Sequence, residues 1–485
     1  MSDIRKLEPK QVWNYFHEIT RIPRPSKKEK RIVDFVVKFG KDLKLETLVD
    51  KTGNVIIRKP ATKGMEKRKG IIFQTHLDMV PQKNSDKKHD FEKDPIETII
   101  DGEWVKANGT TLGSDNGIGV AATLAVLASK DLQHGPLEAL FTIDEETGMT
   151  GANGLRKGLL KGDILVNLDS EDEGELYVGC AGGIDVSISK KYKEENAPRG
   201  YAAYRIDVKG LKGGHSGVDI ALGRANSNKL MSRFLMQAES DFAVRIAETA
   251  GGDLRNAIPR EAYCILLVVS SKAKQFEKFI KGYEKMYRKE FAETEPTLSF
   301  TCKKVQPPAK VMNKPDQYKI IRALFACPNG VQKMSQAMKG LVETSNNLAI
   351  VRCMKGKFEA HNLTRSSVDS SKESTAWRIA AVFHLIDAKV SMSGSYPGWK
   401  PNMESPILKT MSGVYNKMYG KVPEIKAIHA GLECGIIGGV YPGLDMISFG
   451  PTIRYPHSPD EKVNIPSVKK FFDFMCETMK QVPGK

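Results

Sequence analysis

The sequence predicts an α/β protein with two parts: a three-layer α/β domain with a mixed, mostly parallel sheet, and an inserted α+β domain. In residues 1–185, apolar segments of strand length alternate with helical segments, which is typical of a sheet with helices on both faces. Over residues 186–400 the strands become alternating and amphipathic, which is typical of a sheet covered on one face. The first pattern returns over residues 401–485. We therefore expect one domain made of both chain ends and a second domain, 186–400, between them.

The elements of the first domain follow from the spacing of apolar residues. A first helix places Trp13 and Phe16 on one face, and a further helix starts near Asp115. The segment 70–76 is a continuous apolar run, typical of a strand buried on both faces. The remaining elements are helices over 9–20, 26–43, 405–418 and 466–481 and strands over 54–58, 137–143 and 163–168.

The inserted domain combines amphipathic strands, such as 203–208, with four helical segments. It is long enough to form one or two open sheets, or two similar halves, although no sequence repeat is detectable. The helices are predicted over 224–238, 272–290, 314–326 and 370–386.

Composition favours a cytoplasmic protein without a membrane or nucleic-acid partner. No apolar run approaches the ~18 residues of a membrane span, and polar residues follow Met1. The seven cysteines are widely spaced and form no Cys-x-x-Cys pair, which indicates reduced structural thiols. Lysine and arginine number 74 against 58 acidic residues. They are scattered in short groups, so we interpret the net charge of +16 as a solvated basic surface.

Side chains that can bind metals follow the predicted strands of the first domain. His76 and Asp78 follow one strand, Glu145 and Glu146 another, and Asp169 and Glu171 a third. In an open α/β sheet, ligand sites gather beyond the carboxyl ends of the strands. Asp115, just before a helix, adds a further carboxylate. The set predicts a metal site at one edge of the sheet.

Each of these residues also has a simpler interpretation. Asp115 can cap the helix that follows it. Glu145 and Glu146 can form a solvated pair at a strand end, and His76 with Asp78 can belong to a surface turn. Independent turns need not all place ligands at the same ends of consecutive strands, so a shared two-metal centre explains the residues better together than separately.

Peptide hydrolysis requires the residue types that this set provides. Two metals roughly 3.5–4 Å apart can hold a shared hydroxide and polarise the substrate carbonyl. One carboxylate must bridge them, and another must remain unligated to accept a proton from water. The adjacent Glu145 and Glu146 supply a base and a ligand, and Asp78 can orient His76 through its second ring nitrogen.

Four motifs resemble the dizinc exopeptidase clan of aminoacylases, carboxypeptidase G and carnosinases, and most closely its cytosolic aminoacyl-histidine dipeptidase branch. They are Thr75–Val80, Gly113–Gly117, Asp144–Gly148 and Asn167–Glu171. The resemblance extends to Gly431–Gly435 and Pro456–Pro459 and covers essentially the whole chain.

The resemblance implies a role for each position. His76 and Asp169 would bind one zinc, Glu146 and His457 the other, and Asp115 would bridge the two. Glu145 would be the general base and Asp78 would lie behind His76. A cis peptide bond would follow Asp115. Manganese or cobalt could replace zinc, because the ligands are not soft.

In the same clan the inserted domain is a lid that contributes to substrate binding. His215, in a glycine-rich segment, matches the lid histidine that stabilises the developing oxyanion. Asn256 and Arg365 match substrate-binding positions, and Arg365 suits a free carboxylate. Without the resemblance, His215 would be read as part of a turn and Arg365 as a surface residue. Glu433 is a candidate for binding the substrate's amino end.

The leading hypothesis is a cytosolic metallodipeptidase of Xaa-His or broad specificity that acts on small peptides through a metal-bridged hydroxide. The clan also allows an aminoacylase or a tripeptide aminopeptidase. In clan members with a short lid a partner chain supplies the lid histidine, as in a homodimer, whereas members with a doubled lid can supply their own, and the long insert here is like the second kind. A hypothesis from another class is an inactive protein that binds peptides or nucleic acid on the same scaffold.

Overall fold

The computed structural model describes residues 3–485, which form two compact units. Unit 1 comprises Met1–Gly179, Pro401–Ala427 and Leu432–Lys485, of which residues 1 and 2 lie outside the described part. Unit 2 comprises Cys180–Lys400 and the short segment Ile428–Gly431. Among the described residues, no helix combines the length and the apolar character needed to cross a membrane.

Unit 1 is built on an eight-stranded mixed sheet. Its four central strands, β6, β3, β7 and β23, run parallel, and antiparallel strands flank them. In spatial order the strands are β1 (Glu46–Val49), β2 (Val55–Lys59), β6 (Leu137–Thr142), β3 (Ile71–His76), β7 (Ile164–Asn167), β23 (Asp445–Ser448), β8 (Glu175–Cys180) and β22 (Glu424–Ile428). A small second sheet contains β24 (Ile453–Arg454), β25 (Lys462–Asn464), β5 (Trp104–Ala107) and β4 (Thr98–Asp101).

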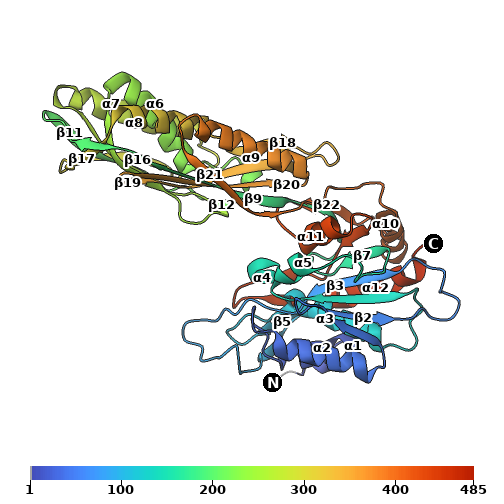
Figure 1. The fold of residues 1–485 in the computed structure, drawn as a ribbon. Helices are drawn as coiled ribbons and strands as arrows, with labels where there is room; N and C mark the ends of the chain where they lie inside the picture. The colour runs from blue at the N-terminus through green and yellow to red at the C-terminus, as the bar shows by residue number, and fades with distance from the viewer. Residues whose placement is uncertain (1–2) are drawn as a thin grey trace. The chain divides into compact units, whose positions relative to one another are not determined.

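Helices cover both faces of this sheet (Figure 1). They are α1 (Lys10–Thr20), α2 (Lys30–Asp42), α3 (Ser114–Ala128), α4 (Glu145–Gly148), α5 (Thr150–Gly154), α10 (Pro406–Tyr419), α11 (Glu433–Val440) and α12 (Ile465–Gln481). Helix α2 packs against Ile57 of β2, whereas Glu433 of α11 contacts Thr142 of β6. Ile57 pairs with Ala139, three residues before Thr142, so the two side chains point to opposite faces. The predicted three-layer α/β architecture with a mixed sheet is confirmed.

The start of α2 differs from the prediction. The expected helix over 26–43 begins only at Lys30. Lys27 has a φ of 68°, a left-handed conformation that a right-handed helix cannot include. The segment before α2 therefore forms a turn.

Unit 2 is built on one antiparallel sheet, not two. The spatial order is β16 (Ser299–Val305), β11 (Tyr201–Lys209), β15 (Ala262–Val269), β13 (Arg245–Gly251), β19 (Val342–Met354), β20 (Lys357–Ser366), β9 (Gly182–Lys191) and β21 (Lys389–Tyr396), with β18 (Gly330–Met334) also paired to β19. Two short ladders pair β10 (Glu194–Asn196) with β17 (Lys310–Met312) and β12 (Gly214–His215) with β14 (Ala257–Ile258).

The sheet of unit 2 consists of two βαββαβ halves, one inserted in the other. The inner half contains α6 (Ser227–Phe242) and α7 (Ala273–Glu290), and the outer half contains α8 (Lys314–Ala326) and α9 (Asp369–His384). The halves join where β13 pairs with β19. The four helices lie on one face of the sheet (Figure 1), over one core around Phe234 and Phe276 and another around Phe358 and Phe383.

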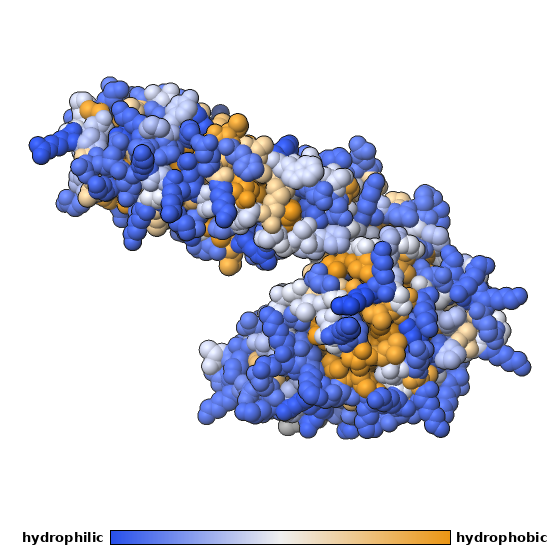
Figure 2. All heavy atoms as spheres, in the orientation of Figure 1, coloured by the Kyte–Doolittle hydropathy of each residue, from blue (hydrophilic) through white to orange (hydrophobic). Residues whose placement is uncertain are grey.

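The surface agrees with the scattered distribution of charge in the sequence. On the face shown in Figure 2, hydrophilic residues cover most of both units, interrupted by hydrophobic areas. Most of the lysine and arginine side chains that form ion pairs do so with nearby acids at the surface, such as Lys30 with Asp34.

Candidate metal centre

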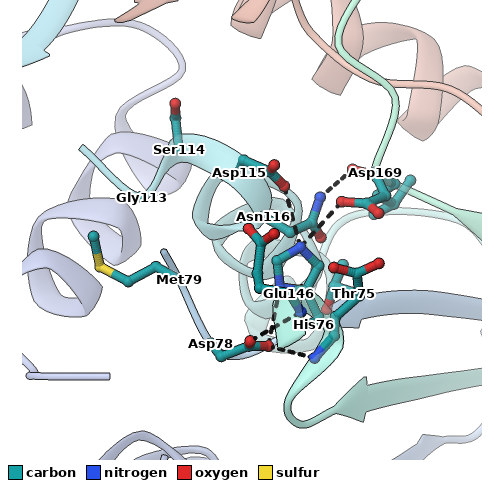
Figure 3. A network of polar contacts seen from close by, with 12 residues as sticks. Thr75, His76, Asp78, Met79, Gly113, Ser114, Asp115, Asn116, Glu146 and Asp169 are labelled. Atoms are coloured by element: carbon teal, nitrogen blue, oxygen red, sulfur yellow. Dashed lines mark hydrogen bonds and ion pairs between the residues drawn. The ribbon is translucent and has the colours of Figure 1, made fainter. Parts of the chain in front are cut away.

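The carboxyl ends of three neighbouring parallel strands deliver the predicted ligands of unit 1. His76 ends β3, Asp169 follows β7, and Glu145 and Glu146 follow β6. Parallel strands end at the same edge of a sheet, so these residues meet although they are far apart in sequence. Figure 3 shows Asp78, Asp115 and Asp169 arranged around the His76 ring.

Asp115 connects two groups that could each hold a cation. Its Oδ1 lies 3.1 Å from His76 Nε2, which is also 3.2 Å from Asp169 Oδ1. Its Oδ2 lies 3.2 Å from His457 Nε2, which is also 3.0 Å from Glu146 Oε2. Each group contains one imidazole and one carboxylate of its own, and the two groups share Asp115.

One buried oxygen atom at this centre, Glu146 Oε1, has no hydrogen-bond partner among the described residues. Asp169 Oδ1 is buried as well, and its contact is with His76 Nε2 at 3.2 Å. Burial and neighbouring carboxylates raise the pKa of Asp169 to about 7, and they also raise the pKa of Glu145 well above its usual value. Hydrogen bonds to Asp115 and Glu146 raise the pKa of His457 to about 11. The centre therefore carries excess negative charge and an open ligand atom, and this donor set fits divalent cations.

Asp78 lies behind the centre and holds three of its members. Its Oδ1 is 3.3 Å from His76 Nδ1. Its two oxygens also accept the backbone N–H groups of Glu145 and Glu146 and the hydroxyl of Ser26. Although burial favours its neutral form, these contacts lower the pKa of Asp78 to about 2. Asp78 thus remains ionised and fixes the orientation of His76.

Two buried charges that the sequence did not reveal hold the loop before Asp115. Glu461 accepts hydrogen bonds from the backbone N–H groups of residues 112–115 and from the hydroxyl of Ser114. Arg24 donates to the carbonyls of Leu77, Asp78 and Gly113. Neither residue belongs to a motif; only the long-range packing brings them to this loop.

The same loop depends on a glycine. Gly113 has a φ of 68°, and a Cβ there would lie 2.5 Å from the Arg24 guanidinium. The peptide bond after Asp115 is cis, as the resemblance implied.

Glu433 lies at the start of α11, with 1% of its surface exposed. Its Oε2 accepts hydrogen bonds from Gln74 Nε2 at 2.5 Å and Thr142 Oγ1 at 2.7 Å. Its Oε1 is buried without a hydrogen-bond partner in the described chain. Burial raises the pKa of Glu433 to about 7. The structure thus places Glu433 on the sheet, beside the strands that carry the metal-centre residues.

Glu171, expected with Asp169 at the end of the strand predicted over 163–168, adds another carboxyl group near these residues. Burial and the charges of Asp115 and Asp169 raise its pKa to about 8. It follows the same strand end as Asp169, β7, as the sequence pattern indicated.

In unit 2, the backbone fixes the orientation of His215. The Nδ1 atom accepts hydrogen bonds from the N–H groups of Gly217 and Val218, at 3.3 and 3.1 Å. The proton of the neutral ring must therefore reside on Nε2. Burial, with the nearby Arg365, lowers the pKa of His215. His215 is thus a neutral donor through Nε2, and Asp219 holds its backbone N–H.

Asn256 lies beside His215, because β12 pairs with β14. Ser216 N–H donates to the carbonyl of Asn256 at 2.8 Å. The buried Asn347 donates from Nδ2 to the carbonyl of Ala257 at 2.8 Å. Asn347 Nδ2 also donates to the carbonyl of Arg255 at 3.4 Å, so the backbone is held on both sides of Asn256.

Arg365 of β20 is close to His215 and is only 5% exposed. Its Nη2 lies 3.5 Å from His215 Nε2, and its Nε lies 3.5 Å from Ser216 Oγ. The structure therefore brings His215, Asn256 and Arg365 together within unit 2. The prediction of a surface residue, made without the resemblance, is wrong for Arg365, because the side chains of Ser216, His215 and Tyr396 lie against its guanidinium.

Comparison with known proteins gives three results. The family model described as "Peptidase family M20/M25/M40" matches residues 72–481. The chain is 45% identical over 485 residues to the cytosol non-specific dipeptidase of Escherichia coli (strain K12), covering 100% of both sequences. The fold matches the crystal structure of aminoacylhistidine dipeptidase from Vibrio alginolyticus with a TM-score of 0.96 and 47% identity, covering 100% of this chain and 99% of the other.

A more distant match is limited to the fold. The aminopeptidase PepT from Bacillus cereus aligns with a TM-score of 0.58 at 16% identity, covering 98% of this chain and 99% of the other.

Proposed function

The chain belongs to peptidase family M20/M25/M40, and from this premise we propose that it is a metal-dependent dipeptidase of Xaa-His or broad specificity. The names of the two relatives that align over the full chain support dipeptides as substrates. The name of the Escherichia coli relative also supports a cytoplasmic location. The observation that carries the proposal is the sharing of Asp115 between two groups of imidazole and carboxylate ligands.

We propose that His76 and Asp169 hold one cation, that Glu146 and His457 hold the other, and that Asp115 contributes one oxygen to each. Two divalent cations would polarise the scissile carbonyl and make a water molecule more acidic. Zinc suits the mixed imidazole and carboxylate set, and manganese or cobalt are the alternatives.

Glu145 is proposed as the general base and acid. It follows β6 directly and belongs with His76 and Glu146 to a cluster whose ligand atoms lie within 4.8 Å of one another. Burial raises the pKa of Glu145 well above its usual value, which favours a carboxyl group that can both take up and release a proton. Glu145 would take a proton from the attacking water and give it to the departing amine.

The unit 2 residues are proposed to bind the substrate. His215 would donate its Nε2–H to the carbonyl oxygen as negative charge develops there. Arg365 would bind the free carboxylate, and Asn256, held beside His215, would contact the peptide. Glu433, with its unpaired Oε1, is proposed for the amino end.

The test is to compare a free dipeptide with its N-acetyl form and with a tripeptide, with and without a chelator. We expect hydrolysis of the free dipeptide alone and its loss with the chelator. Preferred cleavage of the acetylated form would indicate an aminoacylase, and preferred cleavage of the tripeptide an aminopeptidase. A purified protein that binds no metal and cleaves none of the three would overturn the proposal.

A further inference from the structure

The charge of Arg365 is not balanced by an acid. Among residues 3–485, no carboxylate lies within 4.0 Å of its guanidinium, although Arg365 is only 5% exposed. Asp185, whose carboxyl group feels the charge of Arg365, makes its ion pair with Arg255 instead. The contacts of Arg365 within 3.5 Å are with the side chains of Ser216, His215 and Tyr396, which are neutral in this arrangement. A buried guanidinium with neutral neighbours favours a bound anion, because a buried charge is costly without a partner.

The shortest of these contacts is with Tyr396, at the end of β21. Arg365 Nη1 donates to the Tyr396 hydroxyl at 3.1 Å. That contact uses the oxygen of the hydroxyl as an acceptor, so its proton remains to be donated. No acceptor for this proton is found among the hydrogen bonds of the described chain. Tyr396 therefore has an unused donor beside an unbalanced cation.

Tyr396 is held in place from several sides. Its carbonyl accepts a hydrogen bond at 2.5 Å from Lys372, a lysine of α9 that is only 2% exposed. Gly182 and Gly183 of β9 leave room for it, since a Cβ at Gly182 would collide with its carbonyl. A Cβ at Gly183 would lie 2.7 to 2.8 Å from the phenol ring and hydroxyl. The site of the hydroxyl is thus fixed by the surrounding chain.

We propose that Tyr396 is a specificity-determining residue of the peptidase, donating its hydroxyl proton to the free carboxylate of the substrate while it positions Arg365. This inference rests on the proposed function and assigns it one more substrate-binding group. The carboxylate would accept hydrogen bonds from the Arg365 guanidinium and the Tyr396 hydroxyl together. The pair would therefore select peptides that end in a free carboxylate over peptides that end in an amide.

The experiment compares wild type with Tyr396→Phe on a dipeptide and on the same dipeptide with a C-terminal amide. The substitution removes one oxygen and keeps the ring that packs on Gly183. We expect KM for the free dipeptide to rise about 10-fold, the effect of losing one hydrogen bond to a charged group, with kcat changed less than about 2-fold. We expect KM for the amide to stay the same.

The matched control is Tyr318→Phe, which removes a hydroxyl from a tyrosine that is 52% exposed in the same unit. It should leave both substrates unaffected. An unchanged KM for the free dipeptide in Tyr396→Phe, or an equal rise for the acid and the amide, would overturn the role of Tyr396. A wild-type protein that cleaves no dipeptide would instead overturn the proposed function itself.

Discussion

The two candidate sites have opposite imbalances of buried charge. In unit 1, six carboxyl groups (Asp115, Glu145, Glu146, Asp169, Glu171 and Glu433) gather near two histidines. In unit 2, the guanidinium of Arg365 makes its polar contacts with neutral side chains and forms no ion pair among the described residues. Each imbalance indicates the kind of ion that the site would bind: cations at the first site and a carboxylate at the second. An unbalanced buried charge is thus more informative than a balanced pair such as Arg58 with Glu138.

The two sites also tolerate their charge in different ways. Carboxyl groups can take up protons, and burial raises the pKa of Asp169 to about 7. An arginine cannot lose its charge in the range of pH at which proteins fold. Unit 1 can therefore reduce its charge when cations are removed, whereas unit 2 keeps its charge until an anion binds.

The largest expected effect is on turnover. Replacing Glu145 with Gln should lower kcat by roughly 10²- to 10⁴-fold, the usual contribution of a general acid–base group. Metal content should stay the same, because the proposed ligands are unchanged. Kinetics and elemental analysis of the same sample check both parts. A normal kcat in this variant would show that Glu145 is not the general base. Loss of metal from the variant would show that Glu145 is a metal ligand.

Removing the cations should destabilise only unit 1. A ligand present at a thousand times its Kd stabilises the folded state by about 4 kcal/mol. Hydrogen exchange before and after chelation should show faster exchange in the peptides around β3 and β7 than in those around β19 and β20. Returning zinc should restore the protection. Equal changes in both units, or none, would contradict a metal centre confined to unit 1.

Replacing Arg365 with Met should act in opposite directions on binding and stability. We expect KM for dipeptides to rise about 100-fold, because the carboxylate loses a charged partner. The substrate-free protein should become about 1 kcal/mol more stable, because an unbalanced buried charge is removed. Thermal unfolding measures the expected gain in stability, and kinetics measures the expected rise in KM.

The control for that experiment is Arg288→Met. Arg288 is half-exposed and pairs with Glu284 on the surface, so its loss should change neither quantity appreciably. If Arg365→Met proved strongly destabilising, the guanidinium would be a structural group.

The smallest expected effect concerns Asp78. Asp78→Asn keeps the shape of the side chain but weakens the contact with His76 Nδ1, so cation affinity should fall about 10- to 100-fold. Competition with a fluorescent zinc chelator measures this affinity. An unchanged affinity would show that the backbone contacts alone orient the ligands.

The strand pattern of the sequence was sufficient to predict how the metal-centre residues of unit 1 gather. Continuous apolar runs located β3, β6 and β7, and the polar residues at their ends then had to meet at one edge of the sheet. His457 could not be found in this way. It lies in a loop far along the chain, and only the resemblance connected it to Asp115.

Other parts could not be predicted because they depend on contacts between distant segments. Arg24 and Glu461 are single charged residues without a motif, and their partners are backbone groups that no pattern marks. The single sheet of unit 2 depends on the pairing of β13 with β19, which the amphipathic pattern of neither strand specifies. Tyr396 was missed because its hydroxyl meets Arg365 only across the intervening strand β9, which pairs with both β20 and β21.

The nested arrangement of the two halves of unit 2 has a consequence for shortened forms of the protein. Asn196 pairs with Lys310, so deleting residues 197–309 would leave two ends close enough to be joined by a short turn. The remaining half would keep Arg365 and Tyr396 but lose His215. It would also uncover the edge of β19 that now pairs with β13, and an uncovered edge strand readily pairs with another chain. We therefore expect the shortened protein to self-associate through this edge strand. It should still bind the carboxylate of a peptide but should not hydrolyse the peptide bond.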